Sequence, residues 1–345
     1  MSRVALNLDQ IARHIGARIQ GTVELTEISG LASIGTAQPG QLTHLSSAAY
    51  RNQLPTTQAS AVILAEADAA ECPCVALVSE NPYLAFARAT ELFSQQPALE
   101  IGVHPQASIG ADCDIDASAA IGANVVIGAG TVVGPNVRIF ANTVVGERCH
   151  LAEAVTLHAN CTLYSAVKVG ARSTIHSHTA IGSDGFGYTP DEQGHWQAIS
   201  QLGGVTIGAD VSVGSSTTID CGALEDTVIG DGVKIDNQVQ IGHNCQIGEH
   251  TLICGNVGLA GSTIVGKHCV FAGASGAGGD KPVEICDGVI VSQSTVITQS
   301  VQKPGYYSGT ILFSEHGKWR RNALRFPSLD DLFKRVKKIE QRLDD

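Results

Sequence analysis

The chain carries an aliphatic residue at every sixth position over most of its length. The repeat runs without a slip from Val103 to Ile181, which gives fourteen such positions, and it resumes over 207–219, 229–271 and 285–297. Of these 28 core positions, as we name them, 27 hold Ile, Val or Leu, and the exception is Phe271. A period of six sustained this long is typical of a parallel β-helix made of hexapeptide repeats.

The repeat predicts a triangular prism in which three short strands make one coil. Each core position points into the prism, and successive coils stack at the strand spacing of about 4.8 Å. Each buried aliphatic side chain contributes about 1.5–3 kcal/mol, so the column stabilises a fold with few aromatic residues. Gly, Asn and Asp crowd the corners, where the chain turns sharply. A six-residue period favours the left-handed form, an exception to the right-handed crossover rule.

Two regions without this period flank the β-helix, which we place at residues 99–303. Residues 1–98 mix helix-like pieces at 8–15 and 82–93 with strand-like pieces at 60–64 and 74–78. This mixture predicts an α/β module. Residues 304–345, which begin with a Pro-Gly pair, are predicted to be a helical extension.

The C-terminal extension has apolar residues at alternating spacings of three and four, at Leu329, Leu332, Val336, Ile339 and Leu343. Such a seam is typical of a coiled coil. A single helix of this length is marginal in water, so we expect it to pack against copies of itself. Three prisms side by side, each with one such helix, make a homotrimer the expected assembly.

Composition and charge exclude several classes of protein. The 38 glycines and the 5% aromatic content fit a narrow, repetitive core. A net charge of −11 argues against a nucleic-acid binder. The charge is uneven, because residues 303–345 hold ten Lys and Arg against six Asp and Glu. A basic tail on an acidic body is suited to an acidic partner.

Apolar runs and cysteines indicate the compartment. No run of about 18 apolar residues exists, and the N-terminus lacks the apolar segment of a signal peptide, so we expect a cytoplasmic protein without an integral membrane segment. Five of the ten cysteines occupy one place, two residues before a core position: 113, 149, 161, 245 and 269. We interpret them as small buried thiols in a reducing compartment rather than as disulfides or metal ligands. Cys72 and Cys74 are a poor match to a zinc motif.

The longest interruption of the period separates Ile181 from Ile207 and adds 20 residues to the usual six. It reads GSDGFGYTPDEQGHWQAISQLGG (182–204) and carries Phe186, Tyr188 and Trp196. A protruding loop of this kind covers a binding groove or packs against a neighbouring subunit, and the sequence leaves both interpretations open.

One histidine stands in a place of the repeat that holds mostly small residues and a few acids or amides. His243 follows its core position by two, a place that otherwise holds mostly Ala, Gly, Ser and Pro. One and two coils further on, the same place holds Gly261 and Gly279. A titratable group beside a strip without side chains suits a long, thin substrate. The alternative is an exposed corner histidine without a function.

Other histidines are spaced by one coil, namely His158 with His176 and His250 with His268. Each pair is expected to stack on one face. We do not expect a metal between them, since no carboxylate or third ligand accompanies either pair.

Several motifs in fixed order resemble one family. They are NPYLAFARATELF (81–93), GSDGFGY (182–188), TTIDCGALEDTVIG (217–230), IDNQVQIGHN (235–244), LAGS (259–262), EICD (284–287) and PGYYSG (304–309). The chain resembles UDP-3-O-(3-hydroxyacyl)glucosamine N-acyltransferase, an enzyme of lipid A biosynthesis in Gram-negative bacteria. The motifs carry the resemblance, because many acyl- and acetyltransferases share the hexapeptide period.

The resemblance implies a reaction and roles for four residues. A 3-hydroxyacyl group would pass from the phosphopantetheine arm of acyl carrier protein to the 2-amino group of a UDP-glucosamine acylated at position 3, without a further cofactor. His243 would be the general base and the N–H of Gly261 an oxyanion donor. Asp236 and Gln240 would orient the base or contact substrate. The amine would attack directly, with no covalent acyl-enzyme.

The chain also departs from the family pattern. In LTHLSSAAYR (42–51) the family holds uracil between two aromatic rings near an asparagine; Tyr50 matches one ring, but His44 stands where Phe is expected and Ser47 where Asn is. Cys221 replaces the usual Arg. The second histidine expected before EICD is missing, and Asp280 or Lys281 stands nearby.

The basic tail then has an expected partner, because acyl carrier proteins are strongly acidic. Lys318, Arg320, Arg321 and Arg325 are the candidate contacts, whereas the basic residues at 334–338 are interpreted as a solvated helix face.

Two alternatives remain open from the sequence. One is a related O-acyltransferase or N-acetyltransferase on the same prism, and the other is a non-catalytic trimeric scaffold that binds a nucleotide-sugar. The acyl chain length is not predicted.

Overall fold

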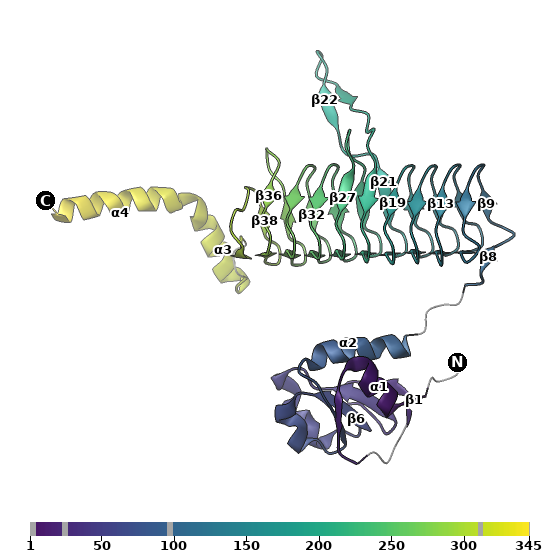
Figure 1. Ribbon diagram of the computed structural model, residues 1–345. Coiled ribbons are helices and arrows are strands. Elements are labelled where there is room, and N and C mark those ends of the chain that lie inside the picture. Colours follow the sequence, from purple (N-terminus) through teal and green to yellow (C-terminus); the bar gives the residue numbers. More distant parts are fainter. Residues whose placement is uncertain (1–4, 23–26, 95–98, 310–312, 345) are drawn as a thin grey trace. The chain divides into compact units, whose positions relative to one another are not determined.

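The computed structural model describes residues 5–22, 27–94, 99–309 and 313–344. The chain divides into two compact units, Met1–Ala98 and Leu99–Asp345. Figure 1 shows an α/β module in the first unit and a long stack of coils in the second. We describe each unit by itself.

The first unit is built on a five-stranded sheet in the order β2-β7-β6-β5-β4, of which only β2 runs antiparallel to its neighbour. Its elements are β1 (Leu6–Asn7), α1 (Leu8–Ile15), β2 (Arg18–Gln20), β3 (Glu27–Ile28), β4 (Gly30–Leu31), β5 (Gln41–His44), the 3₁₀ segment η1 (Ala48–Thr56), β6 (Ala61–Leu64), η2 (Glu66–Glu71), β7 (Val75–Val78) and α2 (Pro82–Phe93). The two predicted helices and the two predicted strands are confirmed.

Successive side chains of β6 point to opposite faces of the sheet, and both faces are covered. Ala61 and Ile63 join the core formed with α1 and α2, whereas Val62 and Leu64 pack with Leu54 of η1 on the other side. A strand points successive side chains to opposite faces, so a fully apolar strand must be buried on both.

The second unit is the predicted parallel β-helix of hexapeptide repeats, with three parallel sheets. The nine-stranded sheet contains β10 (Asp114–Ile115), β13 (Val132–Val133), β16 (His150–Leu151), β19 (Lys168–Val169), β24 (Val205–Ile207), β27 (Thr227–Ile229), β30 (Gln246–Ile247), β33 (Ile264–Val265) and β36 (Glu284–Ile285). The eleven-stranded sheet contains β8 (Gly102–Val103), β11 (Ala120–Ile121), β14 (Arg138–Ile139), β17 (Thr156–Leu157), β20 (Thr174–Ile175), β25 (Ser212–Val213), β28 (Lys234–Ile235), β31 (Leu252–Ile253), β34 (Val270–Phe271), β37 (Val289–Val291) and β39 (Gly305–Tyr307). The ten-stranded sheet contains β9 (Ser108–Ile109), β12 (Val126–Ile127), β15 (Val144–Val145), β18 (Thr162–Leu163), β21 (Ala180–Ser183), β26 (Thr218–Asp220), β29 (Gln240–Ile241), β32 (Gly258–Leu259), β35 (Gly276–Ala277) and β38 (Val296–Ile297).

Where the repeat is uninterrupted, each strand pairs with the strand 18 residues further along, as Val126 and Ile127 do with Val144 and Val145. From Ile121 onward the core positions form one continuous buried cluster, and Phe271 is fully buried within it. At the start of the prism Val103 and Ile109 are exposed and Ile115 is partly buried. The third residue after a core position adopts the left-handed conformation, with φ of 58° at Asn124 and 60° at Asn244. Asn, Asp and Gly tolerate this conformation best, which explains their abundance at the corners.

In many coils the place two residues before a core position holds Thr, Ser or Cys, whose side chain can donate a hydrogen bond, and in most others it holds Val or Ala. Thr131 Oγ1 donates to the carbonyl of Gly146 at 2.8 Å, and Cys245 Sγ donates to the carbonyl of Ala260 at 3.2 Å. Cys149, Cys161, Cys245 and Cys269 are buried at this place, and Cys113 is partly buried. Burial raises the pKa of both Cys161 and Cys245 to about 11. These thiols are therefore structural and remain protonated.

The C-terminal helices are α3 (His316–Arg325) and α4 (Leu329–Asp344), joined by the 3₁₀ segment η3 (Phe326–Ser328). The extension is not helical from residue 304 onward, because Gly305–Tyr307 first add strand β39 to the eleven-stranded sheet. The apolar seam of α4 is exposed, with Val336 42% and Leu343 80% accessible.

Candidate active site

His243 lies at a corner of the prism, directly after β29, and is partly buried. Its Nδ1 is 3.0 Å from Oδ1 of Asn244. The same Oδ1 accepts the N–H of Ala223 at 2.9 Å, while Nδ2 of Asn244 donates to the carbonyl of Glu225 at 3.1 Å. These two bonds orient the amide with its oxygen toward the imidazole. Nδ1 of the neutral ring must then carry the proton, which leaves Nε2 with a free lone pair.

Two glycines make room for this imidazole. A Cβ added to Gly261 would stand 2.5 Å from Nε2 of His243, and one added to Gly185 would stand 2.5 Å from the Cβ of His243. Nε2 thus faces the backbone of Gly261, one coil along the prism. Among the residues that the structure describes, none accepts a hydrogen bond from the Gly261 N–H. The predicted column of His243 and Gly261 brings an unprotonated nitrogen next to a backbone donor.

A strip without side chains extends along the same sheet. In the ten-stranded sheet Gln240 pairs with Gly258, which in turn pairs with Gly276. A Cβ added to Gly258 would meet nothing within 4 Å. Gly258 is exposed, so the outer face of β32 is open backbone beside His243, whereas Gly276 in β35 is buried.

A second polar group lies one coil before His243. Asp220 accepts hydrogen bonds from Ser183 Oγ at 3.0 Å and from Gln240 Nε2 at 2.8 Å. Burial raises the pKa of Asp220, opposed by these two hydrogen bonds and by the charge of His243. Gln240 also accepts a hydrogen bond from Thr218 Oγ1. Gln240 therefore orients Asp220 rather than the imidazole.

Asp236 lies at the preceding corner, after β28. Its carboxylate accepts the backbone N–H groups of Asn237 at 2.8 Å and Gly255 at 3.0 Å. These bonds tie two coils together, and the described contacts of Asp236 do not include His243. A role for Asp236 in binding substrate stays a prediction.

The stem of the long interruption belongs to this site. Gly185 packs against His243, and the backbone of Leu202 and Gly203 donates to the carbonyls of Ala223 and Gly222. The outer part forms an antiparallel hairpin of β22 (Tyr188–Pro190) and β23 (Trp196–Ala198) that stands out from the prism (Figure 1). Phe186 and Trp196 are 87% and 72% exposed there. The stem covers one side of His243, and packing of the hairpin against a second subunit stays a prediction.

In the first unit, His44 ends β5 and is already stacked on an aromatic ring. Its ring centroid is 3.8 Å from that of Phe86 in α2, with Tyr83 tilted at 5.9 Å. Burial lowers the pKa of His44, so its ring is neutral at pH 7. Ser47 caps η1 by accepting the N–H of Ala49, and Tyr50 is 55% exposed. One face of His44 is thus occupied by Phe86, and the exposed ring of Tyr50 is free to contact a ligand.

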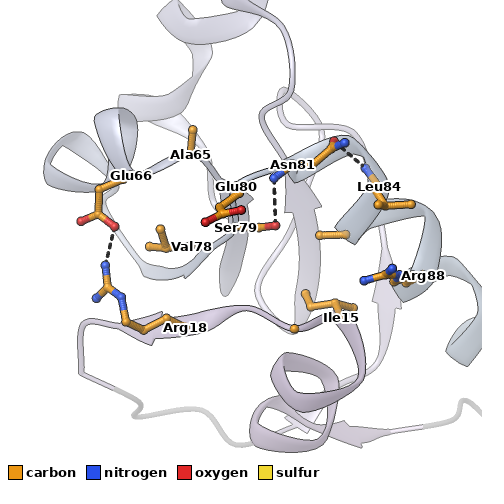
Figure 2. A pocket seen from close by; sticks show the side chains of 12 residues that line it. Ile15, Arg18, Ala65, Glu66, Val78, Ser79, Glu80, Asn81, Leu84 and Arg88 are labelled. Atoms are coloured by element: carbon orange, nitrogen blue, oxygen red, sulfur yellow. Dashed lines mark hydrogen bonds and ion pairs between the residues drawn. The ribbon is translucent and has the colours of Figure 1, made fainter.

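Figure 2 shows a separate cavity of about 660 Å³ in this unit, at the carboxyl ends of β6 and β7 and the N-terminus of α2. Arg18 reaches across to Glu66 at 2.5 Å, and Asn81 caps α2 by accepting the N–H of Leu84. His44, Ser47 and Tyr50 do not line this cavity. The residues expected to bind nucleotide therefore lie outside it.

Sequence reasoning missed four residues of these sites: Asn244, Asp220, Gly185 and Phe86. All four stand inside the motifs that carry the family resemblance, but their contacts depend on interruptions or on helix packing rather than on the repeat.

Cys221 is buried against the prism core, and nothing in the structure explains why Cys stands there. Within the described ranges no cluster of three or more His, Cys, Asp or Glu could hold a metal, and no helix is long and apolar enough to cross a membrane.

The prism and its histidine–glycine site define a hexapeptide-repeat acyltransferase, and residues 226–261 match the family model described as bacterial transferase hexapeptide (six repeats). Residues 26–92 match the model of UDP-3-O-(3-hydroxymyristoyl) glucosamine N-acyltransferase, LpxD. The chain is 45% identical to UDP-3-O-acylglucosamine N-acyltransferase of Pseudomonas aeruginosa strain LESB58, over 99% of this chain and 96% of that protein. It is also 45% identical to the enzyme of that name in Coxiella burnetii strain Dugway 5J108-111, over 97% of each. The chain belongs to the UDP-3-O-acylglucosamine N-acyltransferase family.

Among solved structures, an Arabidopsis UDP-N-acetylglucosamine acyltransferase matches with a TM-score of 0.48 and 23% identity, over 60% of this chain and 69% of that one.

Proposed function

We propose that the protein transfers a 3-hydroxyacyl chain from acyl carrier protein to the 2-amino group of UDP-3-O-(3-hydroxyacyl)glucosamine, a step toward lipid A. The family membership supports the acceptor. The observation that carries the mechanism is the contact between His243 Nδ1 and Asn244 Oδ1, which leaves Nε2 facing Gly261 beside the exposed backbone of Gly258.

The chemistry needs a base and an oxyanion donor. The neutral amine attacks the thioester carbonyl, and Nε2 of His243 takes the proton that the nitrogen loses. The carbonyl oxygen becomes negative in the tetrahedral intermediate, where the Gly261 N–H is placed to donate to it. The intermediate collapses by breaking its C–S bond, and the imidazolium returns the proton to the phosphopantetheine thiolate. The enzyme forms no acyl ester of its own and needs no other cofactor.

The remaining parts of the chain bind the two substrates. The acyl chains lie along the exposed backbone at Gly258, in a groove between neighbouring prisms of a homotrimer. Tyr50 and His44 hold the uracil, and Ser47 replaces the amide expected beside it. The basic side chains of α3 draw in the acidic carrier protein from the cytoplasm.

Removal of the base tests this proposal. We expect His243→Gln to lower the turnover of UDP-3-O-(3-hydroxyacyl)glucosamine with 3-hydroxyacyl carrier protein by about 10²–10⁴-fold. His250→Gln, at an exposed corner, is the matched control. Turnover of the His243 variant within a few-fold of wild type would refute the assignment.

The same assay separates the alternatives. Acetyl-CoA as the only accepted donor, or a hydroxyl acceptor used faster than the amine, would indicate a related O-acyl- or N-acetyltransferase. Absence of transfer with every donor would indicate a scaffold. Mass spectrometry of products from donors of graded chain length would define the acyl preference.

A further inference from the structure

We propose that Asn244 is the positioning residue that fixes the tautomer of His243, and that two interruptions of the repeat exist to hold Asn244. This inference rests on the proposed role of His243 as the base. The side chain of Asn244 does not reach the substrate in this proposal, because its oxygen is turned to Nδ1 of His243 and its nitrogen to the carbonyl of Glu225.

The second interruption supplies both partners of the Asn244 amide. The four extra residues between Ile219 and Ile229 form a loop at 222–226, and this loop presents the N–H of Ala223 and the carbonyl of Glu225. A donor facing Oδ1 and an acceptor facing Nδ2 permit only one orientation of the amide. With the regular spacing of six, these two backbone groups would not exist at this corner.

The first interruption holds the loop in turn. Leu202 and Gly203 donate to the carbonyls of Ala223 and Gly222 at 2.8 and 2.9 Å, and Gly204 donates to Asp226 Oδ1 at 2.9 Å. A Cβ added to Gly222 would lie 1.7 Å from the carbonyl oxygen of Glu225. The loop is therefore packed too closely to turn its backbone groups away from Asn244.

The backbone of Asn244 is fixed as well. Its N–H donates to Thr227 Oγ1 at 2.8 Å, and its φ of 60° lies in the left-handed region. Two carboxylates are near His243. Asp220 interacts with it through charge, and Asp184 directly precedes Gly185, which packs against His243. Neither carboxylate accepts from Nδ1 in the described contacts, so the tautomer depends on Asn244.

The test compares Asn244→Gly with Asn244→Asp. Glycine suits the left-handed backbone and removes the acceptor, whereas aspartate keeps an oxygen toward Nδ1–H and adds charge. We expect turnover to fall by about 10–10³-fold in Asn244→Gly, because part of the histidine then carries its proton on Nε2. Asn244→Asp should keep most of the turnover and move the acidic limb of the kcat/KM profile upward by about one pH unit, since the carboxylate stabilises the imidazolium. Asn256→Gly, at another corner with φ of 59°, is the control.

Nitrogen NMR of 15N-histidine-labelled protein provides a readout independent of turnover, with His243 assigned by its loss in His243→Gln. We expect Nε2 to be the unprotonated nitrogen in wild type and the two forms to mix in Asn244→Gly. A protonated Nε2 in neutral wild-type His243, or equal turnover of the Gly and Asp variants, would overturn the proposal. If His243→Gln retained turnover, the base assignment would fail, whereas the NMR result would still decide the role of Asn244.

Discussion

A single imidazole in this site is bounded by two residues that have no side chain. Gly185 and Gly261 come from different parts of the chain, yet a methyl group on either would stand 2.5 Å from His243. Contacts this short force something to move. The glycines therefore specify where the ring lies, in addition to leaving space for substrate.

Gly261→Ala is expected to lower turnover by about 10²-fold or more, because the methyl group displaces Nε2 from the backbone donor. Gly273→Ala is the matched control, since Gly273 has the same place in the repeat and its added Cβ would meet only the Gly255 carbonyl, at 3.6 Å. Steady-state kinetics and thermal denaturation of both variants check this. Equal kinetics in the two variants would contradict it.

Cys72 and Cys74 lie outside the repeat and differ from its buried thiols. Their sulfurs are 3.9 Å apart, and the hydrogen bond from Cys74 lowers the pKa of Cys72 to about 7. Much of Cys72 is then thiolate at neutral pH, the form that reacts.

We expect iodoacetamide at pH 7 to alkylate Cys72 before the buried Cys161 and Cys245, as seen by peptide mass spectrometry. Replacing Cys74 with Ala removes the hydrogen bond and should slow this reaction at least about tenfold. An unchanged rate in that variant would show that Cys74 does not activate Cys72.

At the scale of single residues, the sequence predicted the column of His243 and Gly261 but not their neighbours. The column could be predicted because residues 18 apart stack in a regular prism. Asn244 and Gly185 could not, since their partners come from interruptions whose backbone path has no period. The partner of His44 was missed for a related reason: Phe86 reaches it only through the packing of α2 on the sheet.

Among the elements, the eleven-stranded sheet carries a ladder of rings on three successive strands. The ring centroids of Phe140 and His158 are 5.3 Å apart, and those of His158 and His176 are 4.8 Å apart. Burial lowers the pKa of His158 below its usual 6.5, aided by the charges of His176 and Arg138. The native protein therefore binds a proton here less readily than the unfolded chain.

Stability should consequently fall with acidity. The free energy of unfolding is expected to stay level above about pH 7 and to decrease as the pH drops through 6.5, where the unfolded state gains the proton first. His158→Phe continues the ladder without a titrating group and should lose less stability between pH 7.5 and 5.5. Urea denaturation at both pH values measures this. An equal loss in the two proteins would contradict the assignment.

The elements themselves were largely predictable. Core positions fell on the second residue of almost every short strand, because a sustained period of six places each aliphatic side chain on the inward face of a hexapeptide coil. The tail was predicted less well, since Gly305–Tyr307 form a strand within residues 304–345, which we predicted to be a helical extension. Backbone pairing to the preceding coil decided that segment, and side-chain pattern does not report backbone pairing.

For the whole molecule, the exposed seam of α4 and the open face beside His243 both lack a partner in the described chain. A seam with Ile339 56% exposed fits the predicted homotrimer. We expect Ile339→Glu to raise the concentration at which the assembly dissociates by at least about tenfold, because a buried carboxylate is costly.

Gln341→Glu introduces the same side chain outside the seam and serves as the control. Sedimentation of both variants over a dilution series provides the measurement. Dissociation of the two variants at the same concentration would argue that the helix is not part of the interface.

The prism repeats by translation along one axis, in steps of 18 residues where the period is regular. Removal of one amino acid from a regular stretch would turn every later interior side chain outward, whereas removal of one whole turn would restore each of them to an equivalent neighbour. If the turn removed is 244–261, the shortened molecule would keep its architecture and yet set His243 against Gly279 instead of Gly261. In this protein, the fold and the active site therefore place separate constraints on the same amino-acid sequence.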